Sequence, residues 1–131
     1  SRPVKTPADK GTVLRKDEVS EPTNNDYRGL VGALVYAVHT RPDVATIVSS
    51  LSRFFDKVTE NHWTATLRVL KYLNGTAALS LVFTPVIRNG NELEVYTDSS
   101  WNTDPDTIRS RSGYIVFFNR CAVSWRSYMQ K

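Results

Sequence analysis

The first half of the chain carries apolar residues at helical spacing. From Tyr27 onward they recur three and four residues apart, as on one face of an α-helix, and Asn24, Asn25 or Asp26 can cap its start. Thr40-Arg41-Pro42-Asp43 is expected to end this helix and begin another, because proline suits the first helical turn. The two apolar sets are Tyr27, Leu30, Val31, Leu34, Val35 and Val38, then Val44, Ile47, Val48, Leu51, Phe54 and Phe55.

A third helix is predicted to begin after Thr59, which can cap it, and to end near Gly75, a residue typical of helix C-termini. These three short helices should form one compact unit over residues 25–76. Residues 1–24 hold three prolines and no periodic apolar pattern, so we expect an extended or disordered lead-in there. In the third helix we expect the inward face to consist of Trp63, Leu67, Leu70 and Leu73.

Beyond residue 76 the pattern becomes that of β-strands. A short apolar run at 79–83 precedes an alternating segment at 92–98, and two more strands at 113–118 and 121–125 flank Asn119-Arg120, a two-residue connection that fits a tight hairpin. The predicted fold class is therefore α+β, a three-helix unit followed over 77–131 by a three- to four-stranded antiparallel sheet. No amphipathic helix follows to cover this sheet, so its face would be covered by self-association, by the lead-in or by nothing.

Composition and charge narrow the function classes. At 131 residues the chain is about one ordinary domain long, and it lacks both an initiator Met and an apolar signal core, so we expect a segment of a longer protein. The net charge of +4 favours a polyanionic partner. No apolar run is long enough for a membrane span. The single cysteine, Cys121, excludes an internal disulfide and fits a reducing, intracellular setting, cytoplasmic or nuclear.

Several ordered motifs carry a family resemblance. They are Tyr27-Arg28-Gly29-Leu30-Val31-Gly32-Ala33-Leu34-Val35-Tyr36, Thr40-Arg41-Pro42-Asp43-Val44-Ala45, Arg68-Val69-Leu70-Lys71-Tyr72-Leu73-Asn74-Gly75-Thr76, Tyr96-Thr97-Asp98-Ser99-Ser100-Trp101 and Arg109-Ser110-Arg111-Ser112-Gly113-Tyr114. With this spacing the chain resembles the polyproteins of copia-type (pseudoviral) retrotransposons, in the stretch where thumb and connection helices of reverse transcriptase lead into ribonuclease H. Ser100 stands where that family usually has a second Asp, and Arg111 where it usually has Thr, which suggests a drifting copy.

The resemblance implies that residues 77–131 form the first strands of a ribonuclease H-like domain, with Asp98 as the first catalytic carboxylate and metal ligand. The complete parent enzyme would hold two Mg²⁺ ions about 4 Å apart, which needs several clustered carboxylates. Glu94 lies four strand residues from Asp98, roughly 13 Å away, and Asp104 and Asp106 are expected to be solvated turn residues. Because no acid follows Asp106, we expect the fragment alone to bind Mg²⁺ poorly and to be inactive.

Cations and hydroxyls supply candidate phosphate contacts. Five cations and no acid follow Thr107, which suits weak, backbone-directed binding of an RNA/DNA hybrid or another duplex; a solvated hairpin is the alternative. In the third helix two cations share a face and could touch phosphate, the alternative being a solvated helix face. The candidate nucleic-acid-binding residues are Arg68, Lys71, Arg109, Ser110, Arg111, Ser112 and Arg126.

The predicted function is that of a Pol polyprotein fragment that, with the rest of the polyprotein, holds the duplex and begins the two-metal nuclease site. A domesticated nucleic-acid- or protein-binding module without catalysis is the alternative, and residual Mg²⁺-dependent nuclease activity is a third. His39, His62 and Cys121 are too scattered to predict a structural metal site.

Overall fold

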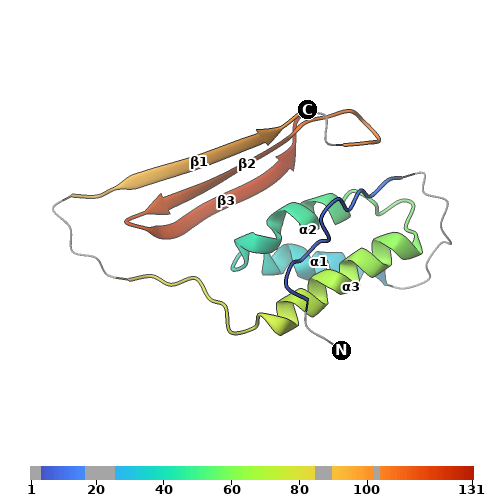
Figure 1. The fold of residues 1–131 in the computed structure, drawn as a ribbon, viewed down its shortest axis with the longest axis horizontal. Helices are drawn as coiled ribbons and strands as arrows, with labels where there is room; N and C mark the ends of the chain where they lie inside the picture. The colour runs from blue at the N-terminus through green and yellow to red at the C-terminus, as the bar shows by residue number, and fades with distance from the viewer. Residues whose placement is uncertain (1–3, 17–25, 85–89, 102–103) are drawn as a thin grey trace. The chain divides into compact units, whose positions relative to one another are not determined.

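The computed structural model describes residues 4–16, 26–84, 90–101 and 104–131. The chain divides into two compact units, residues 1–79 and residues 80–131. Figure 1 shows helices in the first unit and strands in the second. Three helices and a three-stranded antiparallel sheet make the fold class α+β, as the sequence predicts.

The helical unit contains α1 (Tyr27–Ala37), the 3-10 turn η1 (Pro42–Val44), α2 (Ala45–Leu51) and α3 (Glu60–Gly75). Asp26 is the N-cap of α1, and its carboxylate accepts a hydrogen bond from the Gly29 N–H at 2.9 Å. A Cβ at Gly29 would overlap this carboxylate, so glycine makes room for the cap. The sequence had left the choice of cap open between three residues.

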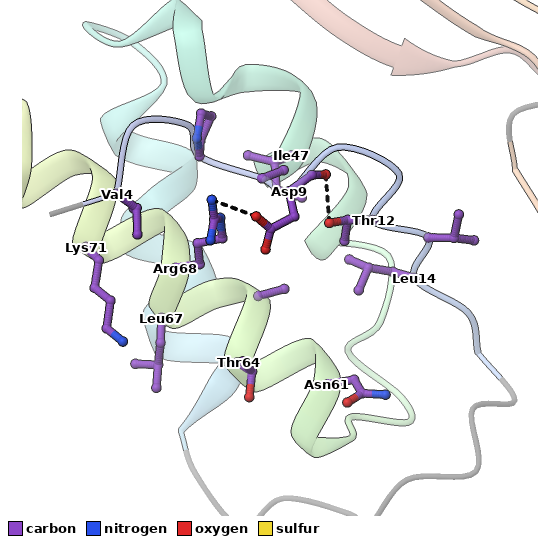
Figure 2. Close-up of a pocket in the computed structure, with 14 residues that line it drawn as sticks. Val4, Asp9, Thr12, Leu14, Ile47, Asn61, Thr64, Leu67, Arg68 and Lys71 are labelled. Carbon is purple, nitrogen blue, oxygen red and sulfur yellow. Dashed lines mark hydrogen bonds and ion pairs between the residues drawn. The ribbon is translucent and has the colours of Figure 1, made fainter. Parts of the chain in front are cut away.

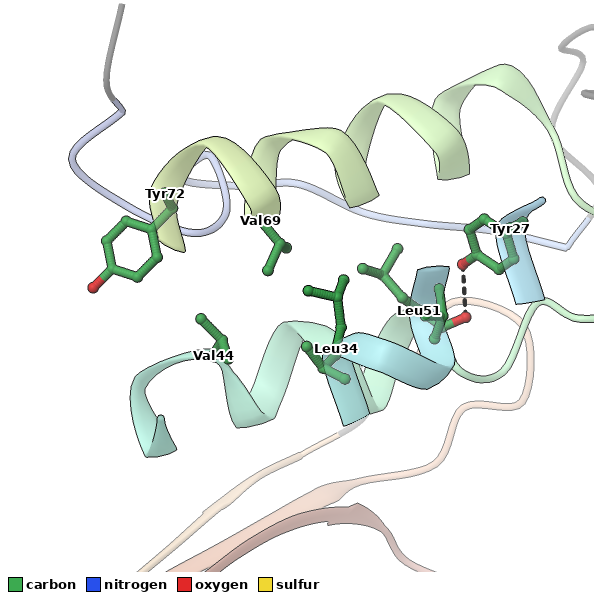
Figure 3. Packing of buried hydrophobic residues seen from close by; sticks show 8 residues of the cluster. Tyr27, Leu34, Val44, Leu51, Val69 and Tyr72 are labelled. Atoms are coloured by element: carbon green, nitrogen blue, oxygen red, sulfur yellow. Dashed lines mark hydrogen bonds between the residues drawn. The ribbon is translucent and has the colours of Figure 1, made fainter. Parts of the chain in front are cut away.

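One apolar core joins the three helices (Figure 3). Leu34 of α1, Leu51 of α2 and Val69 of α3 are each at most 2% exposed. Burying a side chain of this size contributes about 1.5–3 kcal/mol. At one end of the core the Tyr27 hydroxyl of α1 donates to the Leu51 carbonyl of α2 at 2.7 Å. Both of these buried polar groups therefore have a hydrogen-bond partner. The other buried members of the cluster are Tyr27, Val31, Val44, Val48 and Tyr72.

The inward face of α3 differs from the predicted one. The fully or almost fully buried positions of α3 are His62, Thr66, Val69 and Tyr72. The expected set of Trp63, Leu67, Leu70 and Leu73 is only partly buried and flanks the core. Two polar residues can occupy the inward face because each has a local partner. The Thr66 hydroxyl donates to the His62 carbonyl at 2.8 Å, and His62 Nδ1 accepts from the Thr59 N–H at 3.1 Å.

Thr59 caps α3 as predicted, through a capping box in which His62 takes the place usually held by Glu or Gln. The His62 ring also stacks on Phe54, with ring centroids 4.1 Å apart. The N-terminus of α3 is therefore fixed by a buried imidazole that both caps the helix and fills the core.

The segment 4–16 contains neither helix nor strand, yet Val4 and Leu14 pack against the helical core. We call this segment the strap. Residues 17–24 of the predicted lead-in lie outside the described residues.

The second unit is a sheet of β1 (Leu93–Ser100), β2 (Arg111–Phe118) and β3 (Cys121–Met129), antiparallel and in that order. Asn119 and Arg120 both have positive φ, 47° and 68°, as in a type I′ turn, so the predicted tight hairpin is confirmed. The fourth strand expected at 79–83 does not form, since those residues have no regular structure. A β-strand needs a neighbouring strand to pair its backbone N–H and C=O groups. The sheet of the described residues consists of β1, β2 and β3 and does not include residues 79–83.

Candidate nucleic-acid and metal site

Asp98 lies near the end of β1, in a cross-strand row with Gly113 of β2 and Ser127 of β3. Its side chain is exposed and makes no hydrogen bond or ion pair with the described part of the chain. Gly113 has no side chain, so no side chain of β2 lies directly opposite the Asp98 carboxylate. Asp98 is thus accessible to a ligand from solvent.

Strand alternation divides the candidate residues between two faces. Residues in register with one another share a face, so Arg111 lies one row from Asp98 on the same side of the sheet. The Arg111 guanidinium donates to the Ser127 hydroxyl at 3.3 Å. We call this side the Asp98 face. Its strand residues also include Glu94, Tyr96, Ser100, Ile115, Phe117 and Trp125.

Arg126 and Ser112 lie on the opposite face. Arg126 pairs with Tyr114, and its guanidinium sits 5.3 Å from the centre of the Tyr128 ring. Ser112 Oγ accepts a hydrogen bond from Gln130 at 2.7 Å. Ser112, but not Arg126, borders a shallow groove of about 500 Å³, whose lining also includes Thr97, Asp98 and Ser99. The structure therefore brings Asp98 and Ser112 to one groove, whereas Arg126 lies on the face opposite Asp98 and does not line that groove.

The loop before β2 supplies the two remaining candidates of this unit. Arg109 is exposed, and Ser110 is half-buried, with its carbonyl accepting from the Gln130 N–H at 2.9 Å. Asp104 closes the loop, since its N–H donates to the Arg109 carbonyl at 3.2 Å and its carboxylate accepts from the Thr107 hydroxyl. Asp104 is only 3% exposed, so the prediction that it is a solvated turn residue is wrong.

Carboxylates do not cluster around Asp98 within the described residues. Glu94 is on the Asp98 face but four residues along β1, and Asp104 is occupied with its own loop. In the part of the chain that the structure describes, no three His, Cys, Asp or Glu side chains come together in a group that could hold a metal ion. The donors present do not fit a two-metal site.

Arg68 and Lys71 of α3 border a groove of about 430 Å³ between this helix and the strap (Figure 2). Arg68 forms an ion pair with Asp9 of the strap at 2.9 Å and donates to the Thr6 hydroxyl at 3.2 Å. Lys71 is exposed, and it has no ion pair with any described residue. Of the two candidate cations of α3, Arg68 is therefore paired with the strap, whereas Lys71 forms no ion pair with a described residue.

Among the described residues, none of the helices combines the length and the apolar character required to cross a lipid bilayer.

Comparison with known proteins identifies the family. The chain is 38% identical over its whole length to a retrovirus-related Pol polyprotein from transposon RE2 of Arabidopsis thaliana, and 36% identical to that from transposon TNT 1-94 of Nicotiana tabacum. This chain belongs to the copia-type retrotransposon Pol polyproteins. It spans only 9% and 10% of the lengths of these two relatives.

A shorter relative is also similar to this copia-type chain. It is the secreted RxLR effector protein 161 of Plasmopara viticola, which is 43% identical over 82% of the chain and 75% of its own length. Neither a family model nor a solved structure matches the chain.

The copia-type motif Thr40-Arg41-Pro42-Asp43 has a structural role that its sequence pattern did not reveal. Arg41 binds the Asp43 carboxylate through two nitrogens at 3.0 and 2.8 Å, and it also donates to the Thr76 carbonyl at 3.2 Å. The Tyr72 hydroxyl donates to Asp43 at 2.8 Å. We call Arg41, Asp43, Tyr72 and Thr76 the Arg41 latch; it joins η1 to the C-terminal turn of α3.

The latch shifts the pKa values of its members. The hydrogen bond from Arg41 lowers the pKa of Asp43, with a smaller contribution from Tyr72. The hydrogen bond to Asp43 raises the pKa of Arg41 and that of Tyr72. The sequence signal for the latch was the Arg-Pro-Asp order, which places a cation and an acid on either side of a rigid residue.

Proposed function

We propose that this chain is the part of a copia-type Pol polyprotein in which thumb and connection helices of reverse transcriptase lead into the first strands of ribonuclease H. Full-length similarity to two Pol polyproteins supports this, together with a helical unit followed by antiparallel strands. In the parent it helps to hold an RNA/DNA duplex during reverse transcription, inside the cell, in the cytoplasm or the nucleus.

Asp98 is proposed as the first carboxylate of the nuclease site. It is exposed on a strand, and no side chain of β2 lies directly opposite it. Two Mg²⁺ ions in the complete enzyme would polarise the phosphate and activate water. The described residues offer Asp98 no neighbouring carboxylate, so the donor set does not fit that pair, and we expect the chain alone to be hydrolytically inactive.

The observation that carries the duplex proposal is the placement of Arg111 on the Asp98 face, one row from the carboxylate. A duplex whose scissile phosphate approaches Asp98 brings its neighbouring phosphates over this arginine. Arg109 and Ser110 precede it in the loop and extend the same contact. Such contacts position the backbone without reading bases.

The test is binding of an RNA/DNA hybrid over a salt series, measured by fluorescence anisotropy. We expect Arg111→Gln to reduce the slope of log K against log salt by about 0.9, the effect of one lost phosphate contact. Arg126→Gln is the matched control, because it removes the same charge from the opposite face and should leave most of the slope intact. Absence of binding at low salt, or equal losses in both variants, would contradict the proposal.

Hydrolysis is tested on the same hybrid with Mg²⁺. We expect no cleavage by the chain. Mg²⁺-dependent cleavage that disappears in Asp98→Asn would instead establish residual nuclease activity.

A second candidate is a binding module without catalysis, for nucleic acid or for a protein. The effector protein 161 supports it, because this chain covers 75% of that protein, so a protein consisting mostly of such a region exists. A protein-binding module predicts hybrid binding that is absent or insensitive to Arg111→Gln. A nucleic-acid-binding module predicts the same salt slope as the first candidate, but no gain of Asp98-dependent cleavage when the chain is joined to the remaining Pol sequence.

A further inference from the structure

The strap occupies the side of α3 that carries Arg68 and Lys71. The contacts that hold it include packing of Val4 and Leu14 on the core, the Asp9–Arg68 ion pair and the Thr6–Arg68 hydrogen bond. A segment without helix or strand opens at lower cost than the packed helices beside it.

The positive charges of the strap repel those of α3, and Asp9 is the one residue of the strap that attracts them. Residues 4–16 contain four cations and a single acid, Asp9. They lie against a helix side that adds Arg68 and Lys71, and Asp9, the one acid of the strap, pairs with Arg68. A partner that brought several negative charges would neutralise the strap and the helix side together.

Arg68 is incompletely satisfied while the strap is in place. Its terminal nitrogen bonds to Asp9 and Thr6, but its Nε is buried and has no hydrogen-bond partner among the described residues. A buried donor without an acceptor destabilises the closed arrangement. A phosphate group can accept from Nε and a terminal nitrogen at once, in the bidentate geometry that guanidinium groups favour.

We propose that Asp9 occupies the phosphate site of Arg68, and that the strap must leave α3 before Arg68 and Lys71 bind a phosphate backbone. Figure 2 shows the Arg68 side chain directed at the Asp9 carboxylate, while Lys71 extends away from it. Release frees Arg68 and turns the strap into a basic arm that can follow the same backbone. This inference rests on the proposed duplex-binding function and adds its regulation.

The first test is hybrid binding by the full chain and by Asp9→Asn over a salt series. We expect Asp9→Asn to bind about three- to tenfold more tightly, the effect of one added charge-assisted contact, with a slope steeper by about 0.9. Asp56→Asn is the charge-matched control, because the Asp56 side chain is 94% exposed and its ion pair with Arg28, at 3.7 Å, is longer than a hydrogen bond. Adding Arg68→Gln to Asp9→Asn should cancel the gain. Equal gains in Asp9→Asn and Asp56→Asn would overturn the proposal.

A second measurement separates failure of the strap from failure of the proposed function. The Thr12 N–H donates to the Asp9 carbonyl at 3.1 Å in a turn inside the strap, so its hydrogen exchange reports whether the part of the strap that carries Asp9 stays ordered. We expect exchange at Thr12 to accelerate in Asp9→Asn and on adding inorganic polyphosphate to the unmodified chain. If it does so but no hybrid binds, the strap regulates a polyanion site and duplex binding is wrong. Unchanged exchange in Asp9→Asn would refute the strap itself.

Discussion

At the scale of single residues, Arg41 shows how one side chain can connect distant parts of the helical unit. Its side chain is 13% exposed, and its guanidinium bonds both to Asp43, two positions away, and to Thr76, 35 positions away. It also stacks over the Tyr72 ring at 5.6 Å. The C-terminal turn of α3 leaves backbone carbonyls without helical partners, and a cation there stabilises them.

Arg41→Lys should therefore destabilise the helical unit. Lysine keeps the charge but cannot bind the Asp43 carboxylate through two nitrogens while also reaching Thr76. We expect a loss of about 1–3 kcal/mol in the free energy of unfolding, measured by urea denaturation. Lys71→Gln, at an exposed position without an ion pair to the described residues, is the control and should change stability by less than about 0.5 kcal/mol. A similar small effect of Arg41→Lys would show that the latch is not stabilising.

Tyr27 predicts how the helical unit responds to alkaline pH. Burial raises the pKa of Tyr27 from 10.0 to about 12, with a smaller opposing effect from Thr66. Because the folded-state value is the higher one, this contribution to stability is fully present below pH 10 and is lost as the pH rises toward 12. Urea denaturation should show a lower free energy of unfolding at pH 11 than at pH 9.

Tyr27→Phe should be less stable than the unmodified chain at pH 9, because the Leu51 carbonyl loses its hydrogen-bond donor. Its free energy of unfolding should, however, fall less between pH 9 and pH 11, because residue 27 no longer ionises. The remaining loss would come from Tyr72, whose pKa is also raised. An equal alkaline loss in both proteins would contradict the burial argument.

At the scale of elements, local signals predicted where helices and turns begin but not which side of α3 is buried. Asp26, Thr59 and Asn119-Arg120 act at the predicted places, because caps and tight turns depend on neighbouring residues. The phase of α3 depends on His62, a polar residue that is buried through a cap and a ring stack. Hydrophobicity alone assigns such a residue to the surface.

The buried phase of α3 predicts a contrast between two substitutions. His62→Ala removes the cap partner of Thr59 and leaves a cavity beside Phe54, so we expect a loss of about 2–4 kcal/mol in the free energy of unfolding. Leu67→Ala, on the face that the sequence had assigned to the core, should cost about 1 kcal/mol or less. The reverse order of the two losses in thermal or urea unfolding would mean that α3 is rotated from its place in the structure.

The hairpin of the sheet unit predicts a stabilising change. Arg120 has a φ of 68°, a conformation that glycine adopts without the strain of a Cβ. We expect Arg120→Gly to stabilise the sheet unit by about 0.5–1 kcal/mol, seen as slower hydrogen exchange in β2 and β3. Asn119→Gly, which removes the hydrogen bond from the Glu92 N–H to Asn119, is the contrasting variant and should not stabilise. Faster exchange in Arg120→Gly would contradict the turn assignment.

At the scale of the whole molecule, the family resemblance located Asp98, but the sequence could not show which cations accompany it. The hairpin starts with Phe118 opposite Cys121, a register that would place Arg126 opposite Gly113, on the Asp98 face. A one-residue irregularity at Val116/Phe117 shifts the register and pairs Arg126 with Tyr114 instead. A shift of one residue moves every later side chain to the other face.

The activity expected of the chain by itself depends on how many carboxylates it brings together. It aligns over its whole length with about a tenth of each copia-type relative, and among its described residues Asp98 is the one exposed carboxylate on the Asp98 face. Binding of a duplex backbone needs only cations, whereas hydrolysis with two metals needs several carboxylates in one place. We therefore propose that this chain shares in holding the duplex, and we expect no hydrolysis by the chain alone.

Anomalous diffraction from crystals of the full chain soaked in Mn²⁺ tests this assignment most directly. We predict no pair of manganese ions beside Asp98, because one carboxylate cannot offset the repulsion of two dications about 4 Å apart. Two well-occupied ions coordinated by the Asp98 carboxylate would contradict the account.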